Sequence, residues 1–260
     1  ILVHLEMLVF INVPYRMVDD NMGRAASLSV GVEIYLDNHL VEDMDRSHVK
    51  ELGRKLRGHG IPCTVHAPFM DLSPGAFDRT IRRITQDKLK KAVEAANLLD
   101  AKTCICHPGY DKWRFDGNEQ LWLEGSIETW EKVLGDAGDN LPIVVENIFE
   151  ETPSTFIALF DYFKNKNLWY CFDAGHFNLF SIVPLDAWLT PLRHRVREMH
   201  LHDNHGKSDE HLPIGSGTFP FRELKRLVNQ MQGQEIIFTI EPHIEAVVIE
   251  SIKRLKEFLT

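Results

Sequence analysis

The feature of this sequence that most constrains its fold is an eightfold alternation of short apolar runs with longer amphipathic segments. The expected strands are 8–14, 31–36, 62–67, 103–107, 143–147, 169–174, 198–202 and 236–241. The expected helices are 18–28, 47–59, 78–99, 119–134, 153–164, 185–193, 221–230 and 245–258. Short, β-branched runs that are apolar throughout are typical of parallel strands buried on both faces. Eight such units in 260 residues predict a single closed (β/α)8 TIM barrel rather than an open doubly wound sheet.

The chain shows no linker or low-complexity stretch, so we expect residues 1–260 to form one barrel domain. Met7 is a candidate start, which would make 1–6 an upstream extension. The first ten residues lack the basic region and cleavage site of a signal peptide, and this predicts a cytoplasmic location. No apolar run approaches the roughly 20 residues that cross a bilayer, so we expect no membrane span.

Residues that can bind metal ions occur at the carboxyl ends of successive expected strands, where barrel active sites are built. They are His66, His107, Glu146, Asp173, His176, His200, His202 and Glu241, with Asp209 and His211 in the loop after the seventh strand. Glu146 and Glu241 each follow an apolar run, where a carboxylate is costly to bury unless it is paired, hydrogen-bonded or metal-bound. Imidazoles and carboxylates without thiolates predict a divalent ion, zinc or manganese.

The short motifs around these residues follow a family pattern. They read His66-Ala-Pro-Phe, His107-Pro-Gly, Glu146-Asn, Asp173-Ala-Gly-His176, His200-Leu-His-Asp203, Asp209-Glu-His211-Leu-Pro-Ile-Gly-Ser-Gly217 and Glu241-Pro. Together and in this order they resemble the TIM-barrel superfamily of xylose isomerase-like proteins and AP endonuclease family 2. That superfamily contains sugar phosphate isomerases and epimerases as well as endonuclease IV. The resemblance runs from about His66 to Glu241.

The isomerase and epimerase branch implies one divalent ion held by four residues. The matching positions are Glu146, Asp173, His200 and Glu241. In that branch the two glutamates also face the substrate from opposite sides and act as catalytic acid and base. His200 and His202 share one side of the strand, so chemistry does not separate them, and only the family register selects His200.

The endonuclease IV branch implies five further ligands. The matching positions are His66, His107, His176, Asp209 and His211. The full set resembles a trinuclear zinc centre for phosphodiester hydrolysis, in which Glu146 bridges two ions. The resemblance therefore implies between one and three ions.

The surroundings of these residues favour a small substrate over DNA. The formal net charge is −9, and the segment 37–43, expected as a loop, is acidic. Phosphate contacts dominate DNA affinity, so an acidic rim disfavours nucleic acid as a partner. After His107, the side chains of Lys112, Trp113 and Arg114 are candidates for gripping a phosphate or stacking on a sugar.

Three functions stay open at this point. The favoured one is a metal-dependent isomerase or epimerase acting on a sugar, a sugar phosphate or a related small polyol or keto compound. The alternative is an endonuclease IV-like multinuclear zinc phosphoesterase, which the complete ligand set supports. A barrel that has lost catalysis and serves as a binding module is the third, and the intact carboxylates disfavour it. The sequence predicts neither the substrate nor the oligomeric state.

Overall fold

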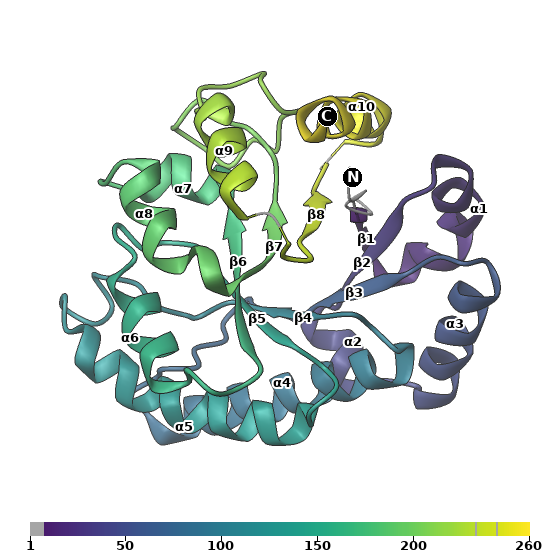
Figure 1. Ribbon diagram of the computed structural model, residues 1–260. Coiled ribbons are helices and arrows are strands. Elements are labelled where there is room, and N and C mark those ends of the chain that lie inside the picture. The colour runs from purple at the N-terminus through teal and green to yellow at the C-terminus, as the bar shows by residue number, and fades with distance from the viewer. Residues whose placement is uncertain (1–7, 232, 243) are drawn as a thin grey trace.

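Eight parallel strands close into a barrel in the computed structural model, which describes residues 8–231, 233–242 and 244–260 (Figure 1). The strands are β1 (Leu8–Pro14), β2 (Gly31–Tyr35), β3 (Cys63–His66), β4 (Cys104–Cys106), β5 (Ile143–Glu146), β6 (Leu168–Asp173), β7 (Val196–His200) and β8 (Ile237–Ile240). Each strand pairs with the next one along the chain, and β8 pairs with β1. The predicted (β/α)8 barrel is thus confirmed. Segment 1–6, the candidate upstream extension, lies outside the described residues.

The helices form a ring around the strands (Figure 1). They are α1 (Val18–Leu28), α2 (Asn38–Glu42), α3 (Arg46–Gly58), α4 (Arg79–Leu99), α5 (Glu119–Ala137), α6 (Ser154–Tyr162), α7 (Ala174–Phe180), α8 (Leu185–Leu192), α9 (Phe221–Val228) and α10 (Val248–Leu259). Single 3-10 turns occupy Tyr15–Met17, Arg193–Arg195, Asn229–Met231 and Glu245–Val247. In the described part of the chain, no helix is long and apolar enough to span a membrane.

Two short helices were not expected from the sequence, and each begins at an aspartate cap. The Asp37 carboxylate accepts a hydrogen bond from the Leu40 amide at the start of α2, and Asp173 accepts one from the His176 amide at the start of α7. Segment 37–43 is therefore mainly helical rather than a loop. Part of its acidity is also compensated, because Glu42 pairs with Lys88.

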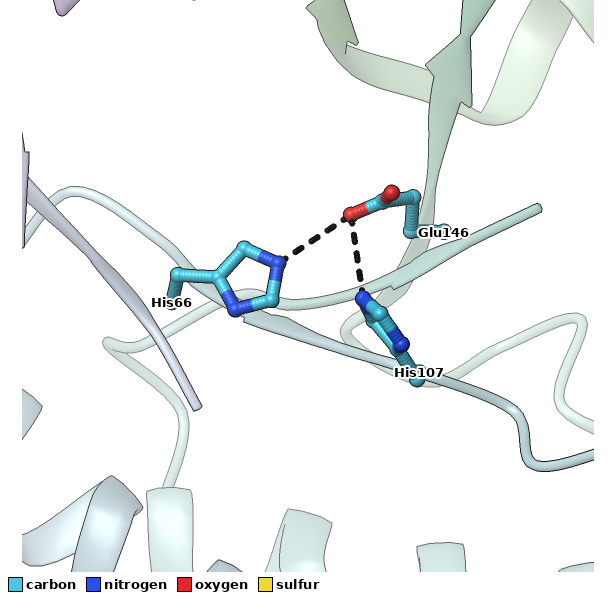
Figure 2. A group of neighbouring side chains, drawn as sticks. All are labelled: His66, His107 and Glu146. Atoms are coloured by element: carbon cyan, nitrogen blue, oxygen red, sulfur yellow. Dashed lines mark hydrogen bonds and ion pairs between the residues drawn. The ribbon is translucent and has the colours of Figure 1, made fainter. Parts of the chain in front are cut away.

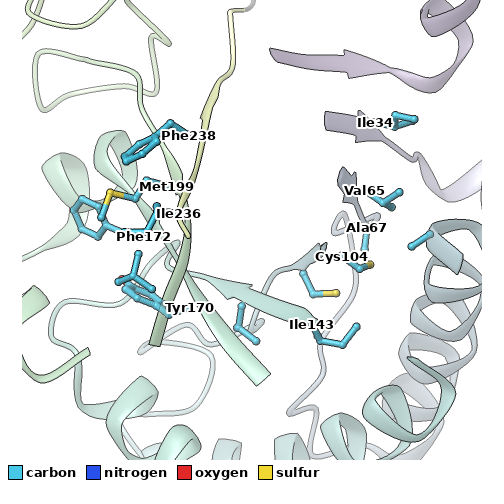
Figure 3. Close-up of a cluster of buried hydrophobic side chains, with 14 of the residues drawn as sticks. Ile34, Val65, Ala67, Cys104, Ile143, Tyr170, Phe172, Met199, Ile236 and Phe238 are labelled. Atoms are coloured by element: carbon cyan, nitrogen blue, oxygen red, sulfur yellow. The ribbon is translucent and has the colours of Figure 1, made fainter. Parts of the chain in front are cut away.

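Apolar side chains fill the layer between the barrel wall and the helices. Figure 3 shows part of this layer, including Ile34, Val65 and Phe172. Trp122 on α5 and Trp188 on α8 are fully buried in it. This packing holds the strands in place from outside and so fixes the relative positions of their ends.

The inside of the barrel is markedly polar. Thr103 and Thr239 donate hydrogen bonds to the two oxygens of Glu198, at 2.8 and 2.9 Å. Thr103 precedes β4 and Glu198 lies on β7, two strands that are not neighbours, so this bond crosses the interior. The polar interior lies directly beneath the carboxyl ends of the strands, where the predicted site residues lie.

Candidate metal centre

The structure brings all nine predicted metal ligands together at the carboxyl end of the barrel. A cavity of about 1390 Å³ opens there. Seven of the nine line it: His66, His107, Glu146, His176, Asp209, His211 and Glu241. The remaining two, Asp173 and His200, are fully buried beside them. The nine residues form three groups. Glu146 belongs to two of them and contacts His176 of the third.

The first group, called here the histidine pair, joins His66, His107 and Glu146. His66 ends β3, His107 follows β4 and Glu146 ends β5, so three adjacent strands present them. The Nε2 atoms of the two histidines lie 3.3 and 3.7 Å from the same oxygen, Oε2 of Glu146 (Figure 2). Phe69 stacks on the His107 ring with centroids 4.3 Å apart, which holds that ring in place.

The second group, called here the inner group, surrounds Nδ1 of His200. That atom lies 3.2 Å from Glu146, 3.4 Å from Glu241 and 3.9 Å from Asp173, measured to carboxylate oxygens. His200 ends β7 and pairs in register with Asp173 at the end of β6. His200, which the family resemblance selects, thus lies among three carboxylates.

The third group, called here the outer group, contains His176, Asp209 and His211. Oδ2 of Asp209 lies 3.5 Å from Nε2 of His176 and 2.9 Å from Nε2 of His211. His176 is placed by the Asp173 cap on α7, and its Nδ1 lies 3.1 Å from Glu146. His211 adopts a left-handed backbone conformation, with φ at 50°, which is uncommon for a residue other than glycine.

These spacings fit metal ligation. Two donors bound at about 2.0–2.1 Å to a tetrahedral ion lie roughly 3.3 Å apart. The distances in the three groups run from 2.9 to 3.9 Å. In addition, Nδ1 of His200 is buried and has no hydrogen-bond partner in the described part of the chain, although three carboxylates surround it. A buried polar atom without a partner is costly, and a cation would satisfy it.

The histidine rings are oriented by their second nitrogen atoms. Nδ1 of His66, His176 and His211 lies 2.9, 3.1 and 2.6 Å from the carbonyl oxygens of Ala67, Asn147 and Glu241, respectively. A carbonyl oxygen only accepts, so each Nδ1 donates, and Nε2 is the atom that faces the centre and would supply the lone pair to an ion. Such outer hydrogen bonds are the usual way in which proteins orient metal-binding histidines.

Several contributors were missed from the sequence. Glu33 on β2 lies 3.1 Å from Nε2 of His200. The Asn147 side chain ties β5 to β6, because its Nδ2 donates to the Asp173 carbonyl and its Oδ1 accepts from the Asp173 amide. His202, which the sequence left as an alternative to His200, lies beside the inner group, with its Nε2 atom 3.0 Å from Oδ2 of Asp173. Glu33 carries the same signal that identified Glu146, a carboxylate within an apolar run.

The two glutamates of the inner group differ electrostatically. Burial acts to raise the pKa of Glu146, but the charge of His200 and the hydrogen bond with His176 outweigh it and hold that pKa well below its ordinary value. Burial raises the pKa of Glu241. Burial also lowers the pKa of His107 to about 3. One carboxylate is thus held ionised while the other is drawn toward protonation.

The three candidate substrate contacts occupy different surroundings. Arg114 lines the cavity, together with Lys207 from the loop after β7. The Lys112 ammonium lies 2.7 Å from a Glu151 carboxylate oxygen, and Trp113 is 84% exposed. Neither Lys112 nor Trp113 is among the residues that line the cavity. Arg114 is therefore the one member of this trio that lines the cavity.

Comparisons with known proteins show the family and the fold of this chain. Residues 26–258 match the sequence model of the family described as "Xylose isomerase-like TIM barrel". "Uncharacterized protein MJ1311" of Methanocaldococcus jannaschii is 28% identical over 207 residues, covering 76% of this chain and 70% of that protein. A D-tagatose 3-epimerase-like protein superposes with a TM-score of 0.82 at 25% identity, covering 96% of both chains. Endonuclease IV from Thermus thermophilus superposes with a TM-score of 0.68 at 19% identity, covering 97% of this chain and 98% of that one.

Proposed function

Because the chain belongs to the xylose isomerase-like TIM barrel family, we propose that it is a divalent-metal-dependent enzyme of isomerase or epimerase type. Its substrate is a small carbohydrate-like compound: a sugar, a sugar phosphate or a related polyol or keto compound. The observation that carries this proposal is the placement of Glu146 and Glu241. They come from β5 and from the end of β8, line the same cavity and flank Nδ1 of His200 at 3.2 and 3.4 Å.

The inner group is the set that would hold the ion. Glu146, Asp173, His200 and Glu241 supply three carboxylates and one imidazole, a donor set suited to zinc or manganese. An ion bound there would supply Lewis-acid polarisation of a carbonyl oxygen.

The protein's own contribution is proton transfer at carbon. The Glu146 carboxylate, held ionised, removes the proton from the carbon next to the carbonyl, and the C–H electron pair moves toward the carbonyl oxygen. Glu241 then donates a proton to the opposite face of that carbon or to its neighbour, and proton exchange with solvent restores both glutamates for the next turnover.

The proposal is tested by proton exchange. The zinc- or manganese-loaded protein is incubated in D₂O with a panel of free ketoses and sugar phosphates, and deuterium at the carbon next to the carbonyl is followed by NMR. We expect exchange with at least one compound, and its loss in Glu146→Gln and Glu241→Gln. Glu210→Gln is the matched control, because Glu210 pairs with His205 outside the cavity and should leave exchange unchanged. Absence of exchange across the panel would overturn the proposal.

The complete set of nine ligands favours a second candidate, a zinc phosphoesterase acting on abasic DNA or another phosphoester. The histidine pair and the outer group extend the inner group in the way the endonuclease IV branch implies. Three tightly bound zinc ions per chain, together with cleavage of an abasic-site oligonucleotide, would replace the isomerase proposal with this one. The acidic overall charge disfavours a polyanionic substrate.

A further inference from the structure

His202 touches both the inner and the outer group, yet it belongs to neither. It lies just beyond β7 and is 2% exposed. Its Nε2 atom lies 3.0 Å from Oδ2 of Asp173, a member of the inner group. The face of its ring stacks on His211 of the outer group, with centroids 4.0 Å apart and planes inclined by 2°. One buried ring thus connects the two groups.

Distance alone would allow His202 to be a ligand of an outer ion. Donor atoms of His202, Asp209 and His211 lie within 4.8 Å of one another. However, an imidazole binds a metal through a lone pair that lies in the plane of its ring. Two parallel rings stacked face to face do not direct their lone pairs at a common point. His202 and His211 therefore do not share an ion in this arrangement.

We propose that His202 is a positioning residue that couples the inner and outer groups. Its Nε2–H donates to Asp173 and fixes that carboxylate, while its face holds the His211 ring in orientation. Nδ1 of His202 is buried and makes no hydrogen bond to the described residues, but it lies 3.7 Å from Oδ1 of Asp209, and Nε2 also lies 4.0 Å from Oε2 of Glu241. Gly175 makes room for it, since a methyl group added there would overlap the His202 ring.

Two substitutions separate the two contacts. His202→Phe keeps a flat ring to stack on His211 but removes the donor to Asp173. His202→Gln places an amide nitrogen near the position of Nε2 but removes the stacking ring. Zn²⁺ is titrated calorimetrically into the full chain after chelator treatment. Each binding event is attributed to a group by the variant that weakens it, Glu241→Gln for the inner group and Asp209→Asn for the outer group.

We expect His202→Phe to weaken the inner ion about 10- to 100-fold, the usual effect of losing a hydrogen bond to a metal ligand. The outer ion should be weakened less, because Nδ1 of His202 approaches Asp209 only to 3.7 Å and makes no hydrogen bond to it. We expect His202→Gln to weaken the outer ion and spare the inner one. His205→Gln is the control, because His205 is exposed and pairs with Glu210. Equal weakening of both ions by both variants, or no weakening by either, would overturn the coupling role.

A measurement on the unaltered protein covers the case in which a variant does not fold. Long-range ¹H–¹⁵N spectra of histidine-labelled protein, recorded during Zn²⁺ titration, report which ring nitrogens bind metal. We expect metal-type shifts at Nε2 of His176 and His211, and none at Nδ1 of His202. A metal-type shift at Nδ1 of His202 would make it a ligand and refute the proposal. This inference rests on the metal centre and not on the reaction, so absence of proton exchange leaves it standing.

Discussion

Nε2 of His200 lies 3.1 Å from Oε2 of Glu33, and both side chains are fully buried inside the barrel. His200 on β7 and Glu33 on β2 are not on neighbouring strands, so the contact spans the barrel interior. The carboxylate accepts from Nε2–H, so Nδ1, which faces Glu146 and Glu241, is the nitrogen available to an ion. Glu33 thus sets the ring orientation and the tautomer that the inner group requires.

Glu33→Gln should therefore weaken metal binding at the inner group by about 10- to 100-fold. A Gln amide group turned toward His200 would compete with Nε2–H as a second donor and favour the opposite tautomer. The matched control is Glu198→Gln. Burial raises the pKa of Glu198 well above its ordinary value, so an uncharged Gln resembles the native side chain. Competition titration with a chromophoric chelator measures both variants, and equal affinities would contradict the role assigned to Glu33.

A buried hydrogen-bond chain supports the other side of the centre. Trp188 Nε1 donates to the Tyr170 hydroxyl at 2.8 Å, and that hydroxyl donates to Oδ1 of Asn147 at 2.7 Å. Tyr170→Phe leaves the buried Trp188 donor without its acceptor, so we expect a loss of about 1–3 kcal/mol in the free energy of unfolding. Urea denaturation measures it. Tyr162→Phe is the control, since its hydroxyl contacts Glu131 on an exposed face, and a change within about 0.5 kcal/mol is expected.

Glu150 gives a prediction for the pH dependence of stability. It is 2% exposed, and burial raises its pKa to about 8. Between its ordinary pKa of about 4.3 and this value, the unfolded chain loses the proton that the folded chain retains. The contribution of Glu150 to stability is therefore complete below the ordinary pKa and falls as pH rises, by up to about 1.4 kcal/mol per pH unit.

The Glu150→Gln variant has no ionisable group at this position, so its free energy of unfolding should not show this decrease with rising pH. Relative to the wild type, the variant should gain stability between pH 5 and pH 8, measured by urea denaturation at both values. Glu151→Gln is the neighbouring control, because the Glu151 carboxylate pairs with Lys112 at the surface, and it should follow the wild type. A constant difference between Glu150→Gln and the wild type across this range would show that Glu150 does not titrate in it.

The barrel and the convergence of the nine candidate ligands could be predicted, the first from position along the chain and the second from strand ends together with the family motifs. Apolar runs mark the strands, and the carboxyl ends of parallel strands meet at one edge, so His66 and Glu146 had to approach each other. Glu33 carries a similar signal, but it lies in the middle of β2 and not at a strand end, where the other candidates lie. Its partner, His200, is 167 positions away, and that pairing depends on the closed barrel.

The contacts of His202 could not be predicted from the sequence, because they depend on where β7 ends and on how the ring is oriented. The seventh strand was expected at 198–202, whereas β7 ends at His200, so His202 belongs to the connection that follows. There its side chain turns to Asp173 and stacks on His211. Orientation of a ring is a property of contacts among distant residues, and spacing along the sequence does not encode it.

Metal removal tests whether the three groups bind ions in the native protein. A ligand that binds only the folded state at a free concentration about 100 times its dissociation constant adds about 2.7 kcal/mol to stability. Excess chelator should therefore lower the thermal unfolding midpoint, and Zn²⁺ or Mn²⁺ should restore it. The response should be largest in the wild type and smallest in Glu146→Gln, because Glu146 is shared by the histidine pair and the inner group. Identical midpoints in chelator and in excess metal would mean that the native protein binds no stabilising ion.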